Sequence, residues 1–395
     1  MSFDIAVSGL NAINQQLGAI SNNIANSGTV GFKSGRAEFA SLYAEGQPLG
    51  VGVTGVAQSI SKSGSIFASA NSLDLAINGD GFFMTRDSAG TTAYTRAGYM
   101  QTDSNGNLIN NRGLYLQGYP VDANGVVQTG TIGNLTISSG SIPAKATSSL
   151  DFTANLNANE KLPENATFDP KDEKSYNHTY ATQVFDSLGR EHTMKQYFVK
   201  TADNEWEVHY YMDDQDLGQT EKMTFTEQGV LQAPTGPVTI NADIPGAEGI
   251  ELTLSYNGTT QFGSDFSVSK NTGNGYASGE RTGQMIDKDG SVYATFSNGE
   301  RLLQGQLVLA SFSNPNGLSS QDGTTWSQTA SSGTPLTGAP GTGLLGAISS
   351  NTLEGSNVDL TAELVGLMTA QRNYQANTKV ISTNDSMMNS LFQAL

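Results

Sequence analysis

The chain has 395 residues, of which 37% are hydrophobic, 14% are charged and 45 are glycine. This hydrophobic content is enough for two or three domains with cores of their own, and the excess of glycine indicates many tight turns. With 20 basic and 37 acidic residues the net charge is −17, which disfavours nucleic acid and anionic lipid as partners because both are negatively charged. The absence of cysteine excludes disulfides, thiolate metal ligands and thiol nucleophiles.

Two further absences concern export and membranes. The first basic residue is Lys33, so the charged start of a secretory signal peptide is missing. No apolar run approaches the ~18 residues that span a bilayer. We therefore expect no membrane insertion, and export, if it occurs, without a cleaved signal peptide.

Residues 3–26 are predicted to form an amphipathic helix. Apolar residues recur every seven positions in two rows, a spacing typical of helices that pack on helices. The rows are Phe3, Leu10, Leu17 and Ile24, and beside them Ala6, Ile13 and Ile20. The helix runs into "ISNNIANSGTVGFKSG" (20–35), which ends it in amides rather than charges and offers Gly28 as a left-handed stop.

The middle of the chain is predicted to be antiparallel β. Residues 28–70, rich in Gly, Ser and Ala, are expected to be a connector that becomes ordered against its neighbours. Beyond them, runs such as "IELTLSY" (250–256) alternate apolar and polar residues, and turn sequences such as "DSNGN" (103–107) are typical of hairpins. Composition shifts near 140–150 and 270–283 indicate an insertion. We expect a first β domain over 71–145 with 286–356, and an inserted acidic β domain over 146–285.

The last segment, 357–395, is predicted to form a second helix, joining 1–27 in a helical layer. Ser356 and Asp359 resemble a capping box at its start. Its seven-residue row is Leu360, Leu367, Tyr374, Ile381, Met388 and Leu395, flanked by Leu364, Val365, Met368, Leu391 and Phe392. Its polar face is mostly amide and hydroxyl, typical of a channel wall along which chains slide, with the candidates Gln371, Asn373, Gln375 and Asn377.

The apolar rows of the two helices are wider than one partner helix covers, so assembly with further copies is expected. The predicted assembly interface comprises Phe3, Leu10, Ile13, Leu17, Ile20, Ile24, Leu360, Leu364, Leu367, Tyr374, Ile381, Met388, Leu391 and Leu395.

Chemical motifs are weak throughout. Two stretches match G-x-G-x-x-G, but with 45 glycines about one chance match is expected, and no βαβ pattern surrounds either. The matches are Gly50, Gly52 and Gly55, and Gly341, Gly343 and Gly346. The histidines 178, 192 and 209 have no metal-site or triad spacing. We expect no catalytic residue, cofactor or metal, although a hidden carboxylate pair, as in a secreted glycosidase, or an adhesive fibre stays open.

The amide-rich stretch resembles the N-terminal signature of the rod and hook family of bacterial flagellar axial proteins. The motif residues are Ser21, Asn22, Asn23, Asn26, Gly31, Phe32 and Lys33. Residues 356–395 resemble the partner signature of that family, and 75–120 its shared β domain. Rod members are generally shorter and lack a large second β domain, so the insertion favours a hook member, with a distal rod protein as the alternative.

The resemblance implies a structural protein that is not an enzyme. In the family the terminal helices form an inner coiled-coil tube, the first β domain a middle layer and the inserted domain an outer layer. The expected function is a short, curved, hollow tube outside the cell that transmits torque as a universal joint and lets exported subunits pass. The implied partners are further copies of the chain, the distal rod, hook cap and hook–filament junction proteins, and the flagellar type III export apparatus.

Overall fold

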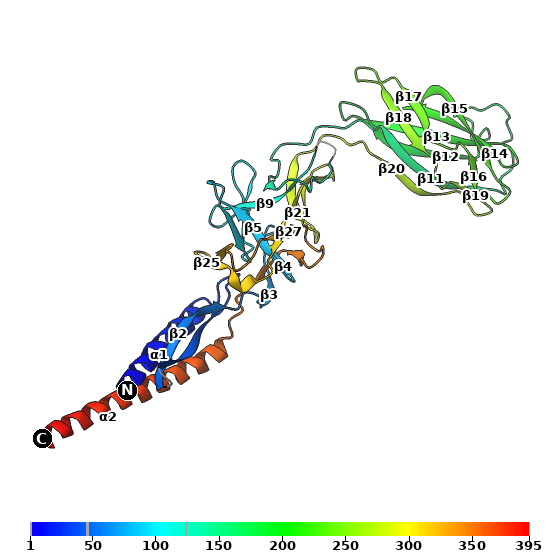
Figure 1. Cartoon of the computed structure of the whole chain (residues 1–395). Coiled ribbons are helices and arrows are strands. Elements are labelled where there is room, and N and C mark those ends of the chain that lie inside the picture. The colour runs from blue at the N-terminus through cyan, green and yellow to red at the C-terminus, as the bar shows by residue number, and fades with distance from the viewer. Residues whose placement is uncertain (1, 45–46, 123–124, 395) are drawn as a thin grey trace. The chain divides into compact units, whose positions relative to one another are not determined.

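The computed structural model describes residues 2–44, 47–122 and 125–394, and over these residues it is mainly β with an α-helix near each end (Figure 1). Helix α1 spans Ser2–Ala25 and α2 spans Leu360–Ala394. The expected fold class, mainly β with helical termini, is confirmed. Neither α-helix in the described part is both long and apolar enough to cross a bilayer. The chain divides into a first unit, 1–139 with 283–295 and 301–395, and a second unit, 140–282 with 296–300.

The second unit consists of two sheets packed face to face. One sheet has the order β17-β18-β11-β19, with β20 also paired to β11, and the other has the order β12-β13-β14-β15-β16. The strands are β11 (Ser149–Asn157), β12 (His178–Phe185), β13 (Glu191–Ala202), β14 (Glu205–Met212), β15 (Gln215–Phe225), β16 (Leu231–Ala233), β17 (Val238–Ala242), β18 (Ile250–Ser255), β19 (Thr260–Phe262) and β20 (Ser267–Gly273). Alternate residues of both sheets, among them Phe152, Trp206 and Leu252, share one buried core, as a period of two requires.

The expectation of purely antiparallel sheets is wrong at β11. This strand pairs in parallel with β18 and β19, while it pairs antiparallel with β20. Parallel neighbours need a long crossover, and the chain between β11 and β18 supplies one by building the other sheet.

The first unit contains a larger sheet, of order β21-β22-β23-β9-β5-β6-β26-β25, and three two-stranded pairings, β1-β2, β28-β4 and β29-β3. Its core gathers Phe82, Tyr94, Phe312 and Trp326. The strands are β1 (Gly35–Ala44), β2 (Gln47–Gln58), β3 (Ile66–Ala68), β4 (Leu75–Asn78), β5 (Phe82–Arg86), β6 (Thr92–Thr95), β7 (Met100–Thr102), β8 (Leu108–Asn110), β9 (Tyr115–Pro120), β10 (Gly133–Asn134), β21 (Arg281–Ile286), β22 (Ser291–Phe296), β23 (Arg301–Leu307), β24 (Leu309–Ser311), β25 (Ser319–Gln321), β26 (Thr325–Ser327), β27 (Leu336–Gly338), β28 (Ala347–Ser350) and β29 (Thr352–Glu354).

The segment expected to be a connector contains a long antiparallel hairpin, with β1 paired to β2 from Gly35↔Gln58 to Ala44↔Gln47. The hairpin packs along α1, so the helix supplies the apolar contacts that the hairpin lacks. The pairing of β29 with β3 brings the segment before α2 beside the segment after the hairpin. These pairings place the two terminal helices side by side (Figure 1).

Candidate assembly interface

The two terminal helices form an antiparallel pair. Asn23 contacts Glu363, the Ile20 side chain lies over Gly366, and Gly9 faces the Asn377 amide. Ile13, Ile20 and Ala370 are the buried centre of the pair, with Leu17, Ile24 and Leu367 packed around them at partial exposure. Five of the predicted interface residues on α1 and α2 therefore already pack within the chain, together with Ala370, which the seven-residue rows did not single out.

The start of α2 differs from the expected capping box. Asp359 is the N-cap, because its Oδ1 accepts hydrogen bonds from the N–H groups of Thr361 (3.0 Å) and Ala362 (3.1 Å). The Ser356 hydroxyl instead accepts from the Val358 N–H at 3.3 Å. The predicted role of Ser356 is therefore wrong, and the acid expected three residues into the helix performs the capping itself.

The asparagines at the end of α1 form hydrogen bonds with backbone groups. An amide both donates and accepts, which explains why this helix ends in amides rather than charges. The buried Asn23 amide donates to the Gly35 carbonyl and accepts from the Gly35 N–H, both at 2.8 Å, as a neighbouring strand would. The same Nδ2 donates to Glu363 Oε1 at 2.8 Å. Asn26 Nδ2 donates to the Asn22 carbonyl at 2.9 Å, which also accepts from the Asn26 backbone N–H at 3.1 Å. Asn23 thus joins α1, the hairpin and α2.

The left-handed residue after α1 is Gly31 rather than Gly28. Gly31 has φ +71°, and a Cβ there would lie 2.5 Å from the Ala97 nitrogen, whereas the surroundings of Gly28 are open. The Gly31 N–H donates to the Glu354 carbonyl at 2.8 Å. The turn therefore occurs where the chain reaches the first β domain, and it directs Phe32 and Lys33 into buried positions.

A buried ion cluster lies where the segments next to α1 and α2 meet the first β domain. Lys33 Nζ lies 2.7 Å from Glu354 Oε1, and Arg96 Nη1 lies 3.1 Å from Glu354 Oε2, with all three side chains almost fully buried. Lys33 also donates to the Lys62 carbonyl (2.8 Å), and Arg96 to the Gly79 carbonyl (2.9 Å). Burial lowers the pKa of Lys33 and of Arg96, and the attraction of Glu354 opposes both shifts.

Sequence reasoning named Lys33 but missed Glu354, Arg96 and Asn357. Asn357 accepts from the Ser34 N–H (2.7 Å) and donates to the Ser59 and Lys62 carbonyls (both 2.9 Å). The available signal was Lys33 itself, an isolated cation directly after Gly31 and Phe32. A lysine that is buried in such a place needs a carboxylate partner. That signal does not identify which of the 37 acidic residues is the partner.

The remaining predicted interface residues are more open. Leu10 and Ile381 are half-buried. Phe3, Leu360, Leu364, Tyr374 and Met388 are exposed, as are Val365 and Met368 beside them. Leu395 lies outside the described residues, as does the side chain of Leu391. The hairpin adds further exposed apolar residues, namely Phe39, Leu42, Tyr43, Leu49, Val53 and Val56.

The four channel candidates do not share one environment. Gln371, Asn373 and Gln375 are exposed, and Asn377 is half-buried. Asn377 lies against Gly9 of α1 and donates to the Asn373 carbonyl at 3.2 Å. Gln371 and Gln375 are thus better placed than Asn377 to face solvent on the side of α2 away from α1.

The other motifs belong to ordinary structure. The first glycine match lies within β2, and the second forms the turn between β27 and β28. In the second unit His178 stacks on Phe266 and His209 on Phe168, with centroids 4.5 and 4.0 Å apart. His192 Nδ1 contacts Asp213 Oδ2 at 2.6 Å, and its Nε2 lies 3.3 Å from Asp186 Oδ2.

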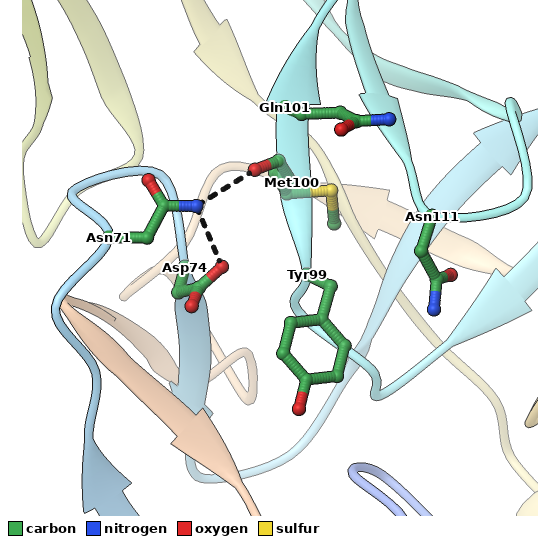
Figure 2. Close-up of a pocket in the computed structure, with 6 residues that line it drawn as sticks. All are labelled: Asn71, Asp74, Tyr99, Met100, Gln101 and Asn111. Carbon is green, nitrogen blue, oxygen red and sulfur yellow. Dashed lines mark hydrogen bonds between the residues drawn. The ribbon is translucent and has the colours of Figure 1, made fainter.

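A hollow of about 330 Å³ beside β7 has a buried carboxylate on its wall, and Figure 2 shows its lining residues. Asn71 Nδ2 donates to Asp74 Oδ1 (3.1 Å) and to the Met100 carbonyl (3.3 Å). The Ser69 hydroxyl donates to the other oxygen of Asp74 at 2.5 Å. Both carboxylate oxygens therefore hold the turn that precedes β4, which is a structural role.

Comparison with known proteins defines the class first. Four family descriptions match in chain order: the flagella basal body rod protein (3–33), the flagellar hook protein FlgE/F/G D1 domain (76–153), the flagellar basal body protein FlaE D2 domain (155–276) and the flagellar basal body rod FlgEFG protein C-terminal region (349–394). Together with the helix pair and the two β units, they define an axial protein of the bacterial flagellum.

Whole-chain relatives narrow the class. The chain is 40% identical to the flagellar hook protein FlgE of Salmonella typhimurium over 403 residues, and 40% identical to that of Escherichia coli K12 over 401, covering 99% of each chain in both cases. It is 33% identical to FlgE of Brucella suis over 396 residues, covering 98% of this chain and 96% of the relative. The chain belongs to the flagellar hook protein FlgE family.

A solved structure supports the fold. The crystal structure of Helicobacter pylori flagellar hook protein FlgE2 matches with a TM-score of 0.56 at 14% identity, over 73% of this chain and all of that chain.

Proposed function

We propose that the exposed apolar rows of the terminal helices assemble this chain into the bacterial flagellar hook. Membership of the FlgE family makes the chain a structural subunit of that hook. The subunits polymerise into a short, curved, hollow tube that acts as a flexible universal joint between rod and filament. The observation that carries the interface is the exposure of Leu360, Leu364 and Val365 on a helix whose other face is already covered by α1.

The helix pair provides the rigid part of this interface. Ile13, Ile20 and Ala370 are buried within the chain, so neighbouring copies meet a preformed surface. Phe3, Leu364 and Met388 then become buried only on assembly, each contributing about 25 cal/mol for every Å² of apolar surface removed from water. Polymerisation therefore strengthens with salts that favour apolar burial.

The channel is proposed to be lined by the uncharged face of α2. Gln371 and Gln375 are exposed there, and amides interact with a passing chain without a fixed charge. In this arrangement residues 1–27 with 357–395 form the inner layer, 71–145 with 286–356 the middle layer and 146–285 the outer layer, with 28–70 connecting the inner layer to the middle layer. The acidic inserted segment then faces water.

The proposed partners follow from the position in the flagellum. Copies of the chain contact one another along the tube, and the tube meets the distal rod, the hook cap and the hook–filament junction proteins at its ends. Subunits reach the extracellular site of assembly through the flagellar type III export apparatus. The role is structural rather than enzymatic.

Electron microscopy of the purified chain after addition of ammonium sulfate tests this proposal. Curved hollow tubes are expected. Straight tubes would instead favour a rod protein, and a chain that stays monomeric across the salt series would contradict the assembly role and direct attention to the carboxylates of the β units.

A further inference from the structure

A hollow of about 350 Å³ lies where α1, α2 and the hairpin meet. Its size is at the lower end of pockets that hold small molecules, about 300 Å³, and is sufficient for a large side chain. Three elements line it, through Gly9, Ala12, Ile13 and Gln16 of α1, Phe39 and Val51 of the hairpin, and Asn373, Ala376 and Asn377 of α2.

Small residues keep this hollow open. Gly9, Ala12 and Ala376 have no side chain beyond Cβ that could fill it. At Gly9 an added Cβ would lie only 3.1 Å from Asn377 Nδ2, so the helices approach closely at this level. Phe39 on the rim is 43% exposed although it belongs to the hairpin that covers α1. The hollow is thus a largely apolar site between the helix pair and the hairpin.

The end of α2 is the matching feature. Gly9 lies level with Asn377, so Ser2, seven residues earlier, lies level with residue 384, seven residues later. Residues 385–394 therefore extend past the start of α1, which at 1.5 Å per residue is about 15 Å. Figure 1 shows the end of α2 beyond the start of α1. Within this overhang Met387 and Met388 are 58% and 47% exposed.

The two surfaces agree in charge and chemistry. None of the hollow's lining residues is charged, and the one charged residue of the overhang is Asp385 at its first position. Contact of the hollow with residues 386–394 therefore requires no charge of either surface to be desolvated. Methionine side chains are flexible and fill irregular apolar gaps, which suits a hollow with both aliphatic and amide walls.

We propose that the hollow of one copy receives Met387 or Met388 from the α2 overhang of a neighbouring copy. The inference rests on the polymerisation proposed above and names the contact that joins successive helix pairs. The overhang of the same chain cannot make this contact. Gln16 lies level with Ala370, and Met388 is 18 residues further along α2, about 27 Å away.

Paired cysteines test the contact directly, because the chain has no cysteine of its own. The double variant Gln16→Cys with Met388→Cys is assembled under reducing conditions, the tubes are confirmed by electron microscopy, and the thiols are then oxidised. Disulfides need Cα atoms about 4.4–6.8 Å apart, so a ladder of dimers and higher multimers on a non-reducing gel is expected. The 27 Å separation within one chain assigns every such bond to two copies.

The matched control is Asn14→Cys with Met388→Cys, since Asn14 is exposed on α1 two residues away but does not line the hollow. We expect at least tenfold less crosslinking from this pair. Tubes that form normally while the Gln16 pair gives no more crosslink than the control would overturn the contact and leave the hook assignment intact. Absence of tubes from the unmodified chain would instead count against polymerisation itself.

A filling variant gives a second readout. Ala376→Leu narrows the hollow at an exposed helical position, where leucine is a good helix former. We expect the monomer to keep its helix content while tube growth slows at least tenfold. Growth at the rate of the unmodified chain would contradict occupation of the hollow.

Discussion

Lys33 Nζ lies 2.7 Å from Glu354 Oε1, an ion pair that joins the segment after α1 to β29, 321 positions later in the chain. Arg96 holds the second oxygen of the same carboxylate. Burial of three charges is costly unless each is paired, so this cluster specifies how the helical segments attach to the first β domain.

Removing the charge of Glu354 should destabilise the first unit. In Glu354→Gln the buried cations Lys33 and Arg96 lose the carboxylate that pairs with both of them, a change that costs about 3–5 kcal/mol in comparable buried pairs. Urea denaturation of the monomer measures the loss. The control is Glu38→Gln, which removes a solvent-exposed pair with Arg36 and should change stability little. Similar effects of the two variants would contradict a structural role for the cluster.

Asn23→Ala should loosen the junction between α1, the hairpin and α2. The variant loses three hydrogen bonds of a buried amide and leaves the Gly35 N–H and carbonyl unpaired, which costs about 1–3 kcal/mol. Hydrogen exchange of the Gly35 amide should accelerate along with the loss in unfolding free energy. Asn14→Ala, at an exposed position of the same helix, serves as the comparison, and an equal response there would refute the assignment.

Gly31→Ala should destabilise the chain far more than Gly28→Ala. Gly31 has a positive φ, and a Cβ added there would lie 2.5 Å from the Ala97 nitrogen, so alanine is both strained and sterically crowded. Nothing lies within 4 Å of a Cβ added at Gly28. We expect a loss of at least about 1–3 kcal/mol at Gly31, and a neutral or slightly stabilising change at Gly28. Thermal unfolding of the two variants measures both changes in stability. A larger loss of stability in Gly28→Ala than in Gly31→Ala would contradict the turn geometry.

Leu364→Asp should abolish tube formation while leaving the monomer folded. Leu364 is 50% exposed, so a carboxylate there stays in water in the monomer and becomes buried only against a neighbour. Leu367 is less suitable for this test because it packs against the core of the helix pair. Circular dichroism checks the monomer and electron microscopy the tubes. Gln375→Asp, proposed to face the channel, should still assemble, and tubes from Leu364→Asp would rule out this part of the interface.

Stability of the second unit should depend on pH through His192. Burial lowers the pKa of His192, but hydrogen bonds with Asp213 and Asp186 outweigh this effect and raise the pKa above its usual value of 6.5. The imidazolium therefore stabilises the fold fully below about pH 6.5, and this contribution is lost as pH rises through the folded pKa. The unmodified chain should therefore lose stability as pH rises above about 6.5, and His192→Asn should not show this loss.

His209 provides the opposite case for comparison. Burial is the largest cause that lowers its pKa, so the unfolded chain takes up the proton first, and stability rises with pH up to about 6.5. The variants to compare are His192→Asn and His209→Asn. Hydrogen exchange of the β13 and β14 amides, measured across this pH range, reports the stability of the second unit in each. The same pH slope in His192→Asn and His209→Asn would contradict the two assignments.

Much of this architecture was predictable from the sequence because it depends on local periodicity. The seven-residue rows predicted both helices, and the alternating runs with Asn-Gly turns predicted the β units, since these patterns act over a few residues. The hairpin at Gly35–Gln58 was not predicted as such, because its strands rely on contact with α1. The parallel pairing of β11 likewise depends on the crossover through the other sheet.

The sequence by itself determined the helical ends, the mainly β middle, the acidic insertion and the amide-rich family motif, all of which follow from patterns carried by neighbouring residues. Only the tertiary structure decided that Glu354 pairs with Lys33 and Arg96, that Asp359 rather than Ser356 caps α2, and that Asn23 joins three elements. These choices depend on groups up to 340 positions apart. Such pairs form because every buried charge and amide needs a hydrogen-bond or ionic partner. The local sequence around an acidic residue does not show which of the many acids in the chain is that partner.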